Sequence, residues 1–78
     1  MAQTNSAFKY DVVEHIATLS EVGNTSKELN RVSYNGAPAK YDLRSWKREN
    51  GTEQMLKGLT LTDEEATALR DALNKREI

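Results

Sequence analysis

The chain has 78 residues, no cysteine and a formal net charge of −1, with 11 Lys and Arg against 12 Asp and Glu. This length leaves room for one small domain, and the lack of cysteine excludes a disulfide scaffold, a thiolate zinc site and a cysteine nucleophile. No apolar run is long enough to span a membrane and the polar start is not a signal peptide, which predicts a cytoplasmic protein. Ala, Val, Ile, Leu, Met, Phe, Trp and Gly together number only 30, so we expect a second copy to complete the core.

The charges divide unevenly along the chain. Residues 1–26 carry a net charge of −2, residues 27–57 carry +3, and residues 58–78 carry −2. The middle of the chain is therefore a candidate surface for a polyanion, although the overall attraction to nucleic acid is expected to be weak.

The first part of the sequence predicts a disordered N-terminal segment followed by a strand. Residues 1–7 are small and polar, and we expect them to be disordered, ahead of a single domain over 8–78. Apolar and charged residues alternate from Phe8, which is a strand pattern that runs to about Leu19. The alternation breaks in its second half, which predicts a bulge or bend near Glu14–His15.

Two further strands follow, separated by turns. Residues 23–26 form a turn, and a second strand runs from about Lys27 to Asn35. Asn35-Gly36 is a strong hairpin signal, and the residues after it suggest a loop slightly longer than two residues. The third strand, 39–47, has the clearest alternation in the chain.

The last third of the chain predicts a loop, a short strand and a helix. We expect a charged loop over 48–54, a fourth strand over 55–61, and a helix that ends near Lys75. Thr62 and Glu65 have the spacing of a capping box, in which each side chain bonds the other residue's backbone amide. Four apolar residues form one stripe on this helix and are the expected dimer interface: Ala66, Leu69, Ala72 and Leu73.

The predicted fold class is α+β, a four-stranded curved antiparallel sheet followed by one C-terminal helix. One short helix with two leucines cannot cover a twisted four-stranded sheet. Either one face of the sheet is solvated and functional, or the helix packs on a dimer mate, and the two alternatives are compatible.

The residues do not predict an enzyme, a cofactor or a metal site. His15 is the only histidine and has no accompanying ligand spacing, so we interpret it as an ordinary strand residue. Asp63 and Glu64 lie beside Glu65 in the first turn of the helix, where carboxylates suit the helix dipole. The four glycines form no phosphate-binding loop.

The third strand carries the pattern that points to a function. Alternation places Lys40, Arg44 and Trp46 on one face, with Arg31 and Ser33 expected beside them on the second strand. Single-stranded nucleic acid offers bases that stack on an aromatic ring, at about 1–3 kcal/mol each, and phosphates that pair with Lys and Arg. On this hypothesis Trp46→Ala weakens binding without unfolding the protein. The alternative is that Trp46 is a core residue beside an ordinary solvated basic face.

Three segments together resemble one known family. The stretches Glu28–Gly36, Lys40–Trp46 and Lys57–Glu65 are similar to the positive cofactor four family of transcriptional coactivators, in its small bacterial YdbC-like branch. The resemblance covers about residues 8–75. The Lys-Tyr-Asp-Leu-Arg-x-Trp strand and the Lys-Gly-Leu-Thr-Leu-Thr run before the helix are its most specific parts.

The resemblance implies a fold, an assembly and a set of contacts. Members of the family fold as a curved four-stranded sheet with a C-terminal helix, dimerise largely through the helices, and bind single-stranded DNA in grooves of opposite polarity. With the basic residues of the third strand included, the expected nucleic-acid contacts are Arg31, Ser33, Asn35, Lys40, Arg44, Trp46, Lys47 and Lys57.

The sequence departs from the family in three places. The Asn35-Gly36 hairpin lacks the basic and aromatic residues of eukaryotic relatives, and there is no Ser-rich and Lys-rich regulatory tail. Strict alternation also places Lys57 on the same face as Leu59 and Leu61, so it can join Arg44 only if the register breaks at Gly58 or the strand begins after Lys57.

Two functions from different classes therefore stand. The first is a homodimeric, sequence-independent single-strand-binding protein, with DNA favoured over RNA, that acts as a coactivator-like transcription regulator. The alternative is a protein-interaction module whose basic sheet face docks an acidic partner, such as a protein of the transcription machinery.

Overall fold

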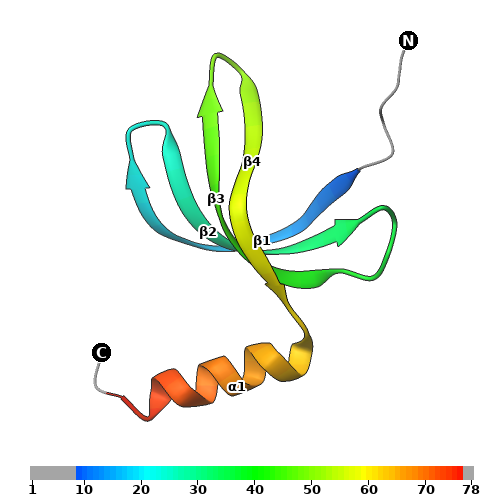
Figure 1. Ribbon diagram of the computed structural model, residues 1–78, viewed down its shortest axis with the longest axis vertical. Helices are drawn as coiled ribbons and strands as arrows, with labels where there is room; N and C mark the ends of the chain where they lie inside the picture. The colour runs from blue at the N-terminus through cyan, green and yellow to red at the C-terminus, as the bar shows by residue number, and fades with distance from the viewer. Residues whose placement is uncertain (1–8, 77–78) are drawn as a thin grey trace.

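The computed structural model describes residues 9–76, so the predicted disordered lead, 1–7, lies outside the described residues. It contains one antiparallel sheet with the strand order β1-β2-β3-β4, followed by one helix (Figure 1). The elements are β1 Tyr10–Val22, β2 Thr25–Tyr34, β3 Lys40–Glu49, β4 Thr52–Leu61 and α1 Asp63–Asn74. The predicted α+β architecture is confirmed. Within the described residues, no helix is long and apolar enough to cross a membrane.

The β3–β4 connection is tighter than the sequence suggested. The predicted loop over 48–54 is wrong, because β3 continues to Glu49 and β4 begins at Thr52. Asn50 and Gly51 form a two-residue turn in which both have positive φ, 54° and 75°, as a type I′ hairpin requires. The charged residues that suggested a loop instead pair across the two strands.

Strand β1 is more irregular than expected. A single bulge was predicted near Glu14–His15, but the pairing with β2 shifts three times, and the shifts pass over Val13, Ile16 and Leu19. Each shift leaves one extra residue on β1, which bends and twists the strand. These bulges contribute to the strong curl of the sheet in Figure 1.

The two faces of the sheet differ in character. The face on which α1 lies, here called the helix face, carries Leu29, Tyr41, Leu43, Leu59 and Leu61. The opposite face, here called the inner face, carries Asn30, Val32, Asp42, Arg44 and Trp46.

The sheet curls around the inner face. The Tyr10 hydroxyl on β1 donates a hydrogen bond to Glu53 Oε1 on β4 at 2.9 Å, although these are the two outer strands of the sheet. This contact closes the inner face over its own side chains. Among the described residues, the only fully buried apolar side chains are Val32 and Trp46, and both belong to it.

Helix α1 begins at the predicted capping box. The Glu65 amide donates to Thr62 Oγ1 at 3.0 Å, and the Thr62 amide donates to Glu65 Oε1 at 2.9 Å. The helix stands off the sheet and leaves a cavity of about 590 Å³ between them. Leu69 and Leu73 on its apolar stripe remain 41% and 48% exposed. The helix therefore does not complete the apolar core within one chain.

Gly58 lets β3 and β4 approach closely. It pairs with Arg44, and a Cβ atom at position 58 would overlap the Arg44 Cβ and lie 2.5 Å from the Leu43 carbonyl oxygen. The Arg44 side chain runs on to donate to the Leu56 carbonyl oxygen at 3.0 Å. Close packing against β3 thus explains why position 58 is a glycine.

Candidate nucleic-acid interface

Trp46 lies in the interior of the curled sheet. Its side chain has no exposed surface, and its ring centroid is 5.6 Å from that of Tyr10. The Arg48 guanidinium lies 5.4 Å from the Trp46 ring centroid. The prediction that Trp46 presents an open ring for stacking is therefore wrong, because alternation gives the face of a side chain but not whether the sheet closes over that face.

Arg44 is also held within the fold. Its Nε and Nη2 donate to the two oxygens of Asp42 at 2.6 and 2.8 Å, and Nη1 donates to the Leu56 carbonyl. Asp42 is fully buried and also accepts a hydrogen bond from the Tyr34 hydroxyl. Burial and this carboxylate raise the pKa of Tyr34 to about 12. The expectation of a free Arg44 beside an open tryptophan is wrong, because a bidentate pair with a buried carboxylate occupies the guanidinium.

A second arginine–carboxylate cluster covers the tryptophan. Arg48 Nη1 donates to Glu28 Oε2 at 2.6 Å, and Arg48 Nε donates to Glu53 Oε2 at 3.0 Å. Glu28 is 5% exposed and also accepts from Ser26 at 2.5 Å and from Asn30 at 3.3 Å. The inner face is therefore a satisfied polar network around Trp46, not an open binding surface.

This network predicts sensitivity to acid. The hydrogen bond from Arg48 holds the pKa of Glu28 at about 2, below its ordinary value of 4.5. A lowered pKa in the folded state stabilises the fold above pH 4.5, and this contribution is lost as the pH falls towards 2. We expect the loss from Glu28 to be on the order of 3 kcal/mol in the free energy of unfolding. Thermal unfolding between pH 2 and 7 measures it. Glu28→Gln should be less stable at pH 7 and flatter below pH 4.5, and an unchanged slope would contradict this origin.

The residues of β2 and the following turn that were predicted to contact nucleic acid interact largely with other residues of the chain. Arg31 lies on the helix face, where its guanidinium is 4.8 Å from the Tyr41 ring centroid and 3.8 Å from the Asp63 carboxylate. The Ser33 hydroxyl donates to the Ala37 carbonyl at 2.6 Å. Asn35 accepts from the Lys9 amide at 2.8 Å. The expectation that Arg31 and Ser33 lie beside Lys40, Arg44 and Trp46 is wrong, because the register places them on opposite faces.

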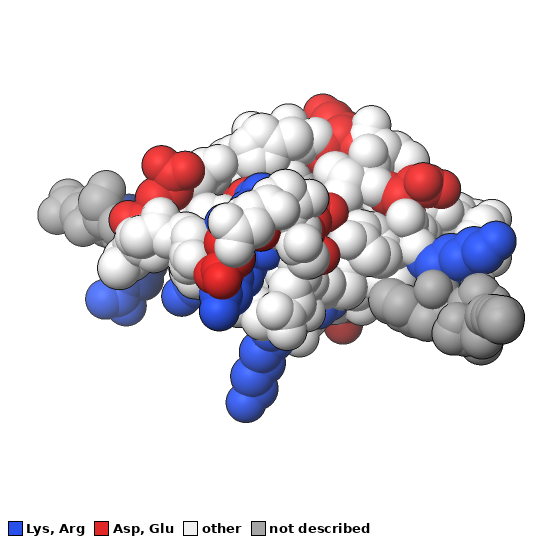
Figure 2. Space-filling view, turned by 90° about the horizontal axis from the view of Figure 1, so that it is seen from above, with Lys and Arg blue, Asp and Glu red and all other residues white. Residues whose placement is uncertain are grey.

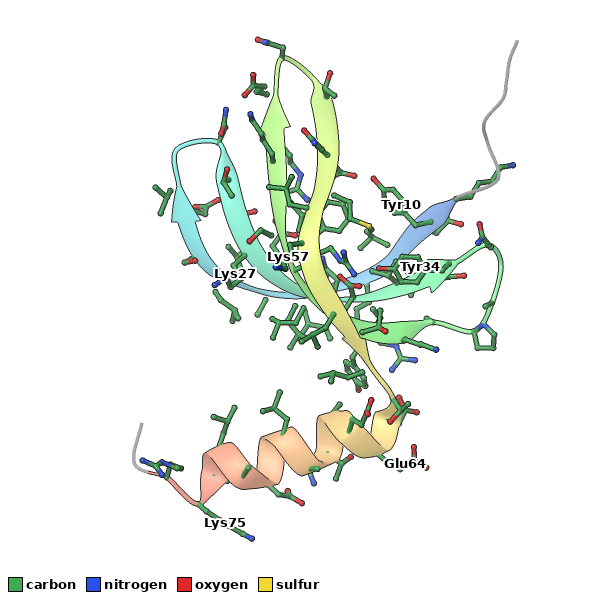
Figure 3. All side chains as sticks on the ribbon, in the orientation of Figure 1. Tyr10, Lys27, Tyr34, Lys57, Glu64 and Lys75 are labelled. Carbon is green, nitrogen blue, oxygen red and sulfur yellow. The ribbon has the colours of Figure 1, made fainter. Side chains whose placement is uncertain are left out.

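Three lysines instead gather on the helix face, at the end of the sheet away from α1. Lys27 pairs with Ser45, and the β4 residues opposite Ser45 are Leu56 and Lys57, at a register shift. Lys57 lies at this shift, next to Gly58, and alternation continued from Leu59 and Gly58 gives it the same face as Leu59. Lys27 and Lys57 are therefore two strands apart, roughly 10 Å, and Figure 3 shows both on the body of the sheet.

Lys47 extends this group by one position along β3. It pairs with Thr25 and Gln54 and follows Ser45 on the same face. Lys27 and Lys57 are exposed and, among the described residues, have no ion pair, whereas Lys47 Nζ lies 3.6 Å from Glu49 Oε1. We call Lys27, Lys57 and Lys47 the lysine row.

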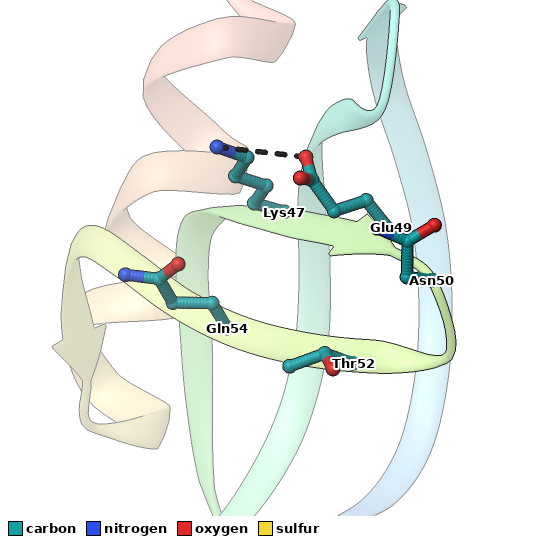
Figure 4. Close-up of a pocket in the computed structure, with 5 residues that line it drawn as sticks. All are labelled: Lys47, Glu49, Asn50, Thr52 and Gln54. Atoms are coloured by element: carbon teal, nitrogen blue, oxygen red, sulfur yellow. Dashed lines mark ion pairs between the residues drawn. The ribbon is translucent and has the colours of Figure 1, made fainter.

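A shallow pocket lies at the end of the lysine row. It has a volume of about 260 Å³ and is lined by Lys47, Glu49, Asn50, Thr52 and Gln54 at the β3–β4 hairpin (Figure 4). In this view Lys47 and Gln54 come from neighbouring strands and flank one opening. Hydroxyl, carboxamide and ammonium groups of this kind bind phosphate and sugar oxygens.

Basic and acidic side chains are unevenly distributed on the side of the molecule shown in Figure 2. In Figure 2 most long basic side chains project from the lower side of the view, while acidic side chains lie mainly on the upper side. Lys40 is exposed but pairs with Val32, so it belongs to the inner face and not to the lysine row.

The sequence did not single out Lys27 as a binding residue. It alternates with Leu29 and Arg31 along β2, so its face could have been found once the pairing with β3 was known. The pairing shifts at Leu56 and Lys57, beside Gly58, and alternation continued from Leu59 and Gly58 keeps Lys57 on the face opposite to Arg44. Alternation in the sequence therefore predicted the face of Lys57 correctly.

Fold and site together define a small ββββα binding domain with an exposed cationic row. Among the described residues, no group of three His, Cys, Asp or Glu side chains could hold a metal ion. Residues 23–72 match the family described as Transcriptional Coactivator p15 (PC4), and the chain belongs to this family. This membership confirms the resemblance, and it implies single-stranded DNA binding in general. The family is not enzymatic, which agrees with the prediction from the residues.

A bacterial relative extends the similarity beyond this segment. An uncharacterized protein of Treponema pallidum (strain Nichols) is 48% identical over 71 residues, which is 90% of this chain and 81% of the relative. The similarity therefore includes β1 in addition to the segment that matches the family.

Proposed function

We propose that this protein binds single-stranded DNA without sequence preference through the lysine row, as a homodimer and a coactivator-like transcription regulator in the cytoplasm. The observation that carries the proposal is the row itself, in which two exposed lysines have no ion pair within residues 9–76 and a third lies beside a polar pocket. Ammonium groups contact phosphates whatever the base, so phosphate contacts set affinity without specifying sequence.

The curvature of the sheet favours a single strand over a duplex. The lysine row crosses β2, β3 and β4 in the half of the sheet that carries the β1–β2 and β3–β4 turns, and the sheet is strongly curved (Figure 1). Duplex DNA has a persistence length of about 150 base pairs and bends only at a cost, whereas a single strand follows a curved surface. With Trp46 buried, stacking contributes little and the phosphates dominate.

The apolar gap between α1 and the sheet supports the homodimer. Leu59 is 51% exposed on the sheet, and Leu69 and Leu73 face the cavity while nearly half exposed. A second copy that inserts the same stripe would bury apolar surface at about 25 cal/mol per Å². The proposed interface is formed by Ala66, Leu69, Ala72 and Leu73.

Titration of a fluorescein-labelled 20-nucleotide thymidine oligomer, followed by anisotropy, tests this function. We expect binding at 50 mM salt and much weaker competition by the matching duplex. The logarithm of the association constant should fall by about 0.7 per phosphate contact for each tenfold increase in salt. A uridine oligomer measures the preference for DNA over RNA, and light scattering measures the dimer.

Two outcomes would overturn the proposal. The first is an absence of binding to the labelled oligomer at 50 mM salt. The second is equal binding of duplex and single strand. The first would favour the alternative function, in which the lysine row docks an acidic protein.

A further inference from the structure

The chain contains two Asn-Gly turns with the same dipeptide and similar φ angles. Asn35-Gly36 follows β2, and Asn50-Gly51 joins β3 to β4. All four residues have positive φ, between 53° and 79°, which asparagine and glycine tolerate best. The two turns differ in what holds the side chain of the asparagine.

Asn35 is held by Lys9 through two hydrogen bonds. The side-chain Oδ1 of Asn35 accepts from the Lys9 amide at 2.8 Å, and the Asn35 amide donates to the Lys9 carbonyl at 2.8 Å. By contrast, the Asn50 side chain is exposed and makes no hydrogen bond within residues 9–76. The Asn50 carboxamide can therefore rotate, whereas the Asn35 carboxamide is fixed.

An asparagine that precedes a glycine can react with its own backbone. The glycine nitrogen, once its proton has passed to solvent hydroxide, attacks the side-chain Cγ of the asparagine. A C–N bond forms, the side-chain nitrogen takes a proton from water and leaves as ammonia, and a cyclic succinimide results. Water then opens this ring to aspartate or isoaspartate, so the net reaction consumes one water and releases one ammonia. The reaction needs a carboxamide that can turn toward an unshielded glycine nitrogen.

The Asn50-Gly51 turn meets both requirements. The Asn50 carboxamide can turn, and a Cβ atom built at Gly51 would meet no atom of the described residues within 4 Å, so the backbone there is open. Gly36 is equally open, so access to the nitrogen does not distinguish the two turns. The hydrogen bond from Lys9 to Asn35 does distinguish them.

The product would carry a new negative charge at the end of the lysine row. Asn50 lines the pocket together with Lys47 and Glu49 (Figure 4). The Lys47 ammonium already lies 3.6 Å from Glu49 Oε1, and the Asn24 side chain donates to the same oxygen. A second carboxylate at this position would oppose the approach of a phosphate to Lys47.

We propose that Asn50 is a site of deamidation, and that its conversion to aspartate or isoaspartate weakens the binding of single strands. The site is independent of the proposed function, whereas its effect on binding rests on that function. Isoaspartate would also lengthen the two-residue turn, because the backbone then passes through the side-chain carbon. The conversion needs no enzyme and would lower the affinity of the protein as it ages.

Peptide mapping by mass spectrometry, after incubation of the protein in warm, mildly alkaline buffer, tests the site. Trypsin places Asn50 on peptide 49–57 and Asn35 on peptide 32–40, and neither peptide contains another asparagine. We expect the mass gain of deamidation on peptide 49–57 at about ten times the rate on peptide 32–40, because one hydrogen bond must break before Asn35 can turn. Lys9→Pro removes the amide that donates to Asn35 and should bring the two rates together.

Titration of the labelled thymidine oligomer tests the effect on binding. Asn50→Asp should bind about fivefold more weakly at 100 mM salt, on the order of the contribution of one lysine. Asn50→Gly accepts positive φ without adding a charge, so it should bind as the parent protein does. Incubation should lower the affinity of the parent protein in proportion to the converted fraction, and it should leave the affinity of Asn50→Gly unchanged.

Three results would overturn the inference. Equal deamidation of the two peptides in the parent protein, or none on peptide 49–57, would remove the site. An Asn50→Asp variant with parental affinity would remove the effect on binding. If the unmodified protein does not bind the oligomer, the proposed function and the effect on binding fail together, whereas the mass gain on peptide 49–57 still establishes the site.

Discussion

Replacing Trp46 by alanine is expected to lower the free energy of unfolding by about 3–5 kcal/mol, the usual cost of deleting a large buried aromatic side chain. Trp46 and Val32 are the fully buried apolar side chains of the described residues, so few others can compensate. A domain of this size has a total stability of about 5–15 kcal/mol. The variant should therefore be largely unfolded or melt far below the parent protein. Chemical unfolding followed by circular dichroism measures this, since the variant lacks its fluorophore.

Trp46→Phe provides the control for this prediction. The indole Nε1 has no hydrogen-bond partner among the described residues, so phenylalanine sacrifices no hydrogen bond and keeps most of the packing. We expect it to be considerably more stable than Trp46→Ala. A Trp46→Ala protein with parental stability but reduced affinity for the oligomer would contradict the burial and restore the stacking hypothesis.

Removing the three lysines of the row is expected to abolish most binding to single strands. The test variant is Lys27→Ala/Lys47→Ala/Lys57→Ala. Its slope of log association constant against log salt should be shallower by about two per protomer, because each phosphate contact contributes about 0.7 to this slope. We expect affinity at 100 mM salt to fall on the order of a hundredfold. The side chains are exposed or half-buried, so the free energy of unfolding should change by no more than about 0.5 kcal/mol per substitution.

Lys40→Ala is the matched control for the lysine row. Lys40 is an exposed lysine of the same strand as Lys47, but it lies on the inner face. Its removal should change affinity and salt dependence little. If it costs as much as the triple variant, the contact surface is the inner face and the lysine row is not the site.

Local patterns in the sequence determined the secondary structure well. Alternation identified the strands, Asn35-Gly36 identified the turn after β2, and the spacing of Thr62 and Glu65 identified the start of the helix. The exceptions have physical causes. At 48–54 a polar composition suggested a loop, but the charged side chains pair across a hairpin. On β1 one bulge was predicted and three are present, because the register depends on both paired strands.

The sequence alone therefore determined the four strands, the capped helix and a basic middle segment, because each depends on neighbours in the chain. Only the tertiary structure decided which cations are free. Arg44 and Trp46 alternate onto the same face, but the curl of the sheet closes that face and pairs the arginine with Asp42. Lys27 and Lys57 are 30 residues apart and meet only through the register of β2, β3 and β4. Burial and cross-strand pairing are properties of the whole sheet, which periodicity within a single strand does not contain.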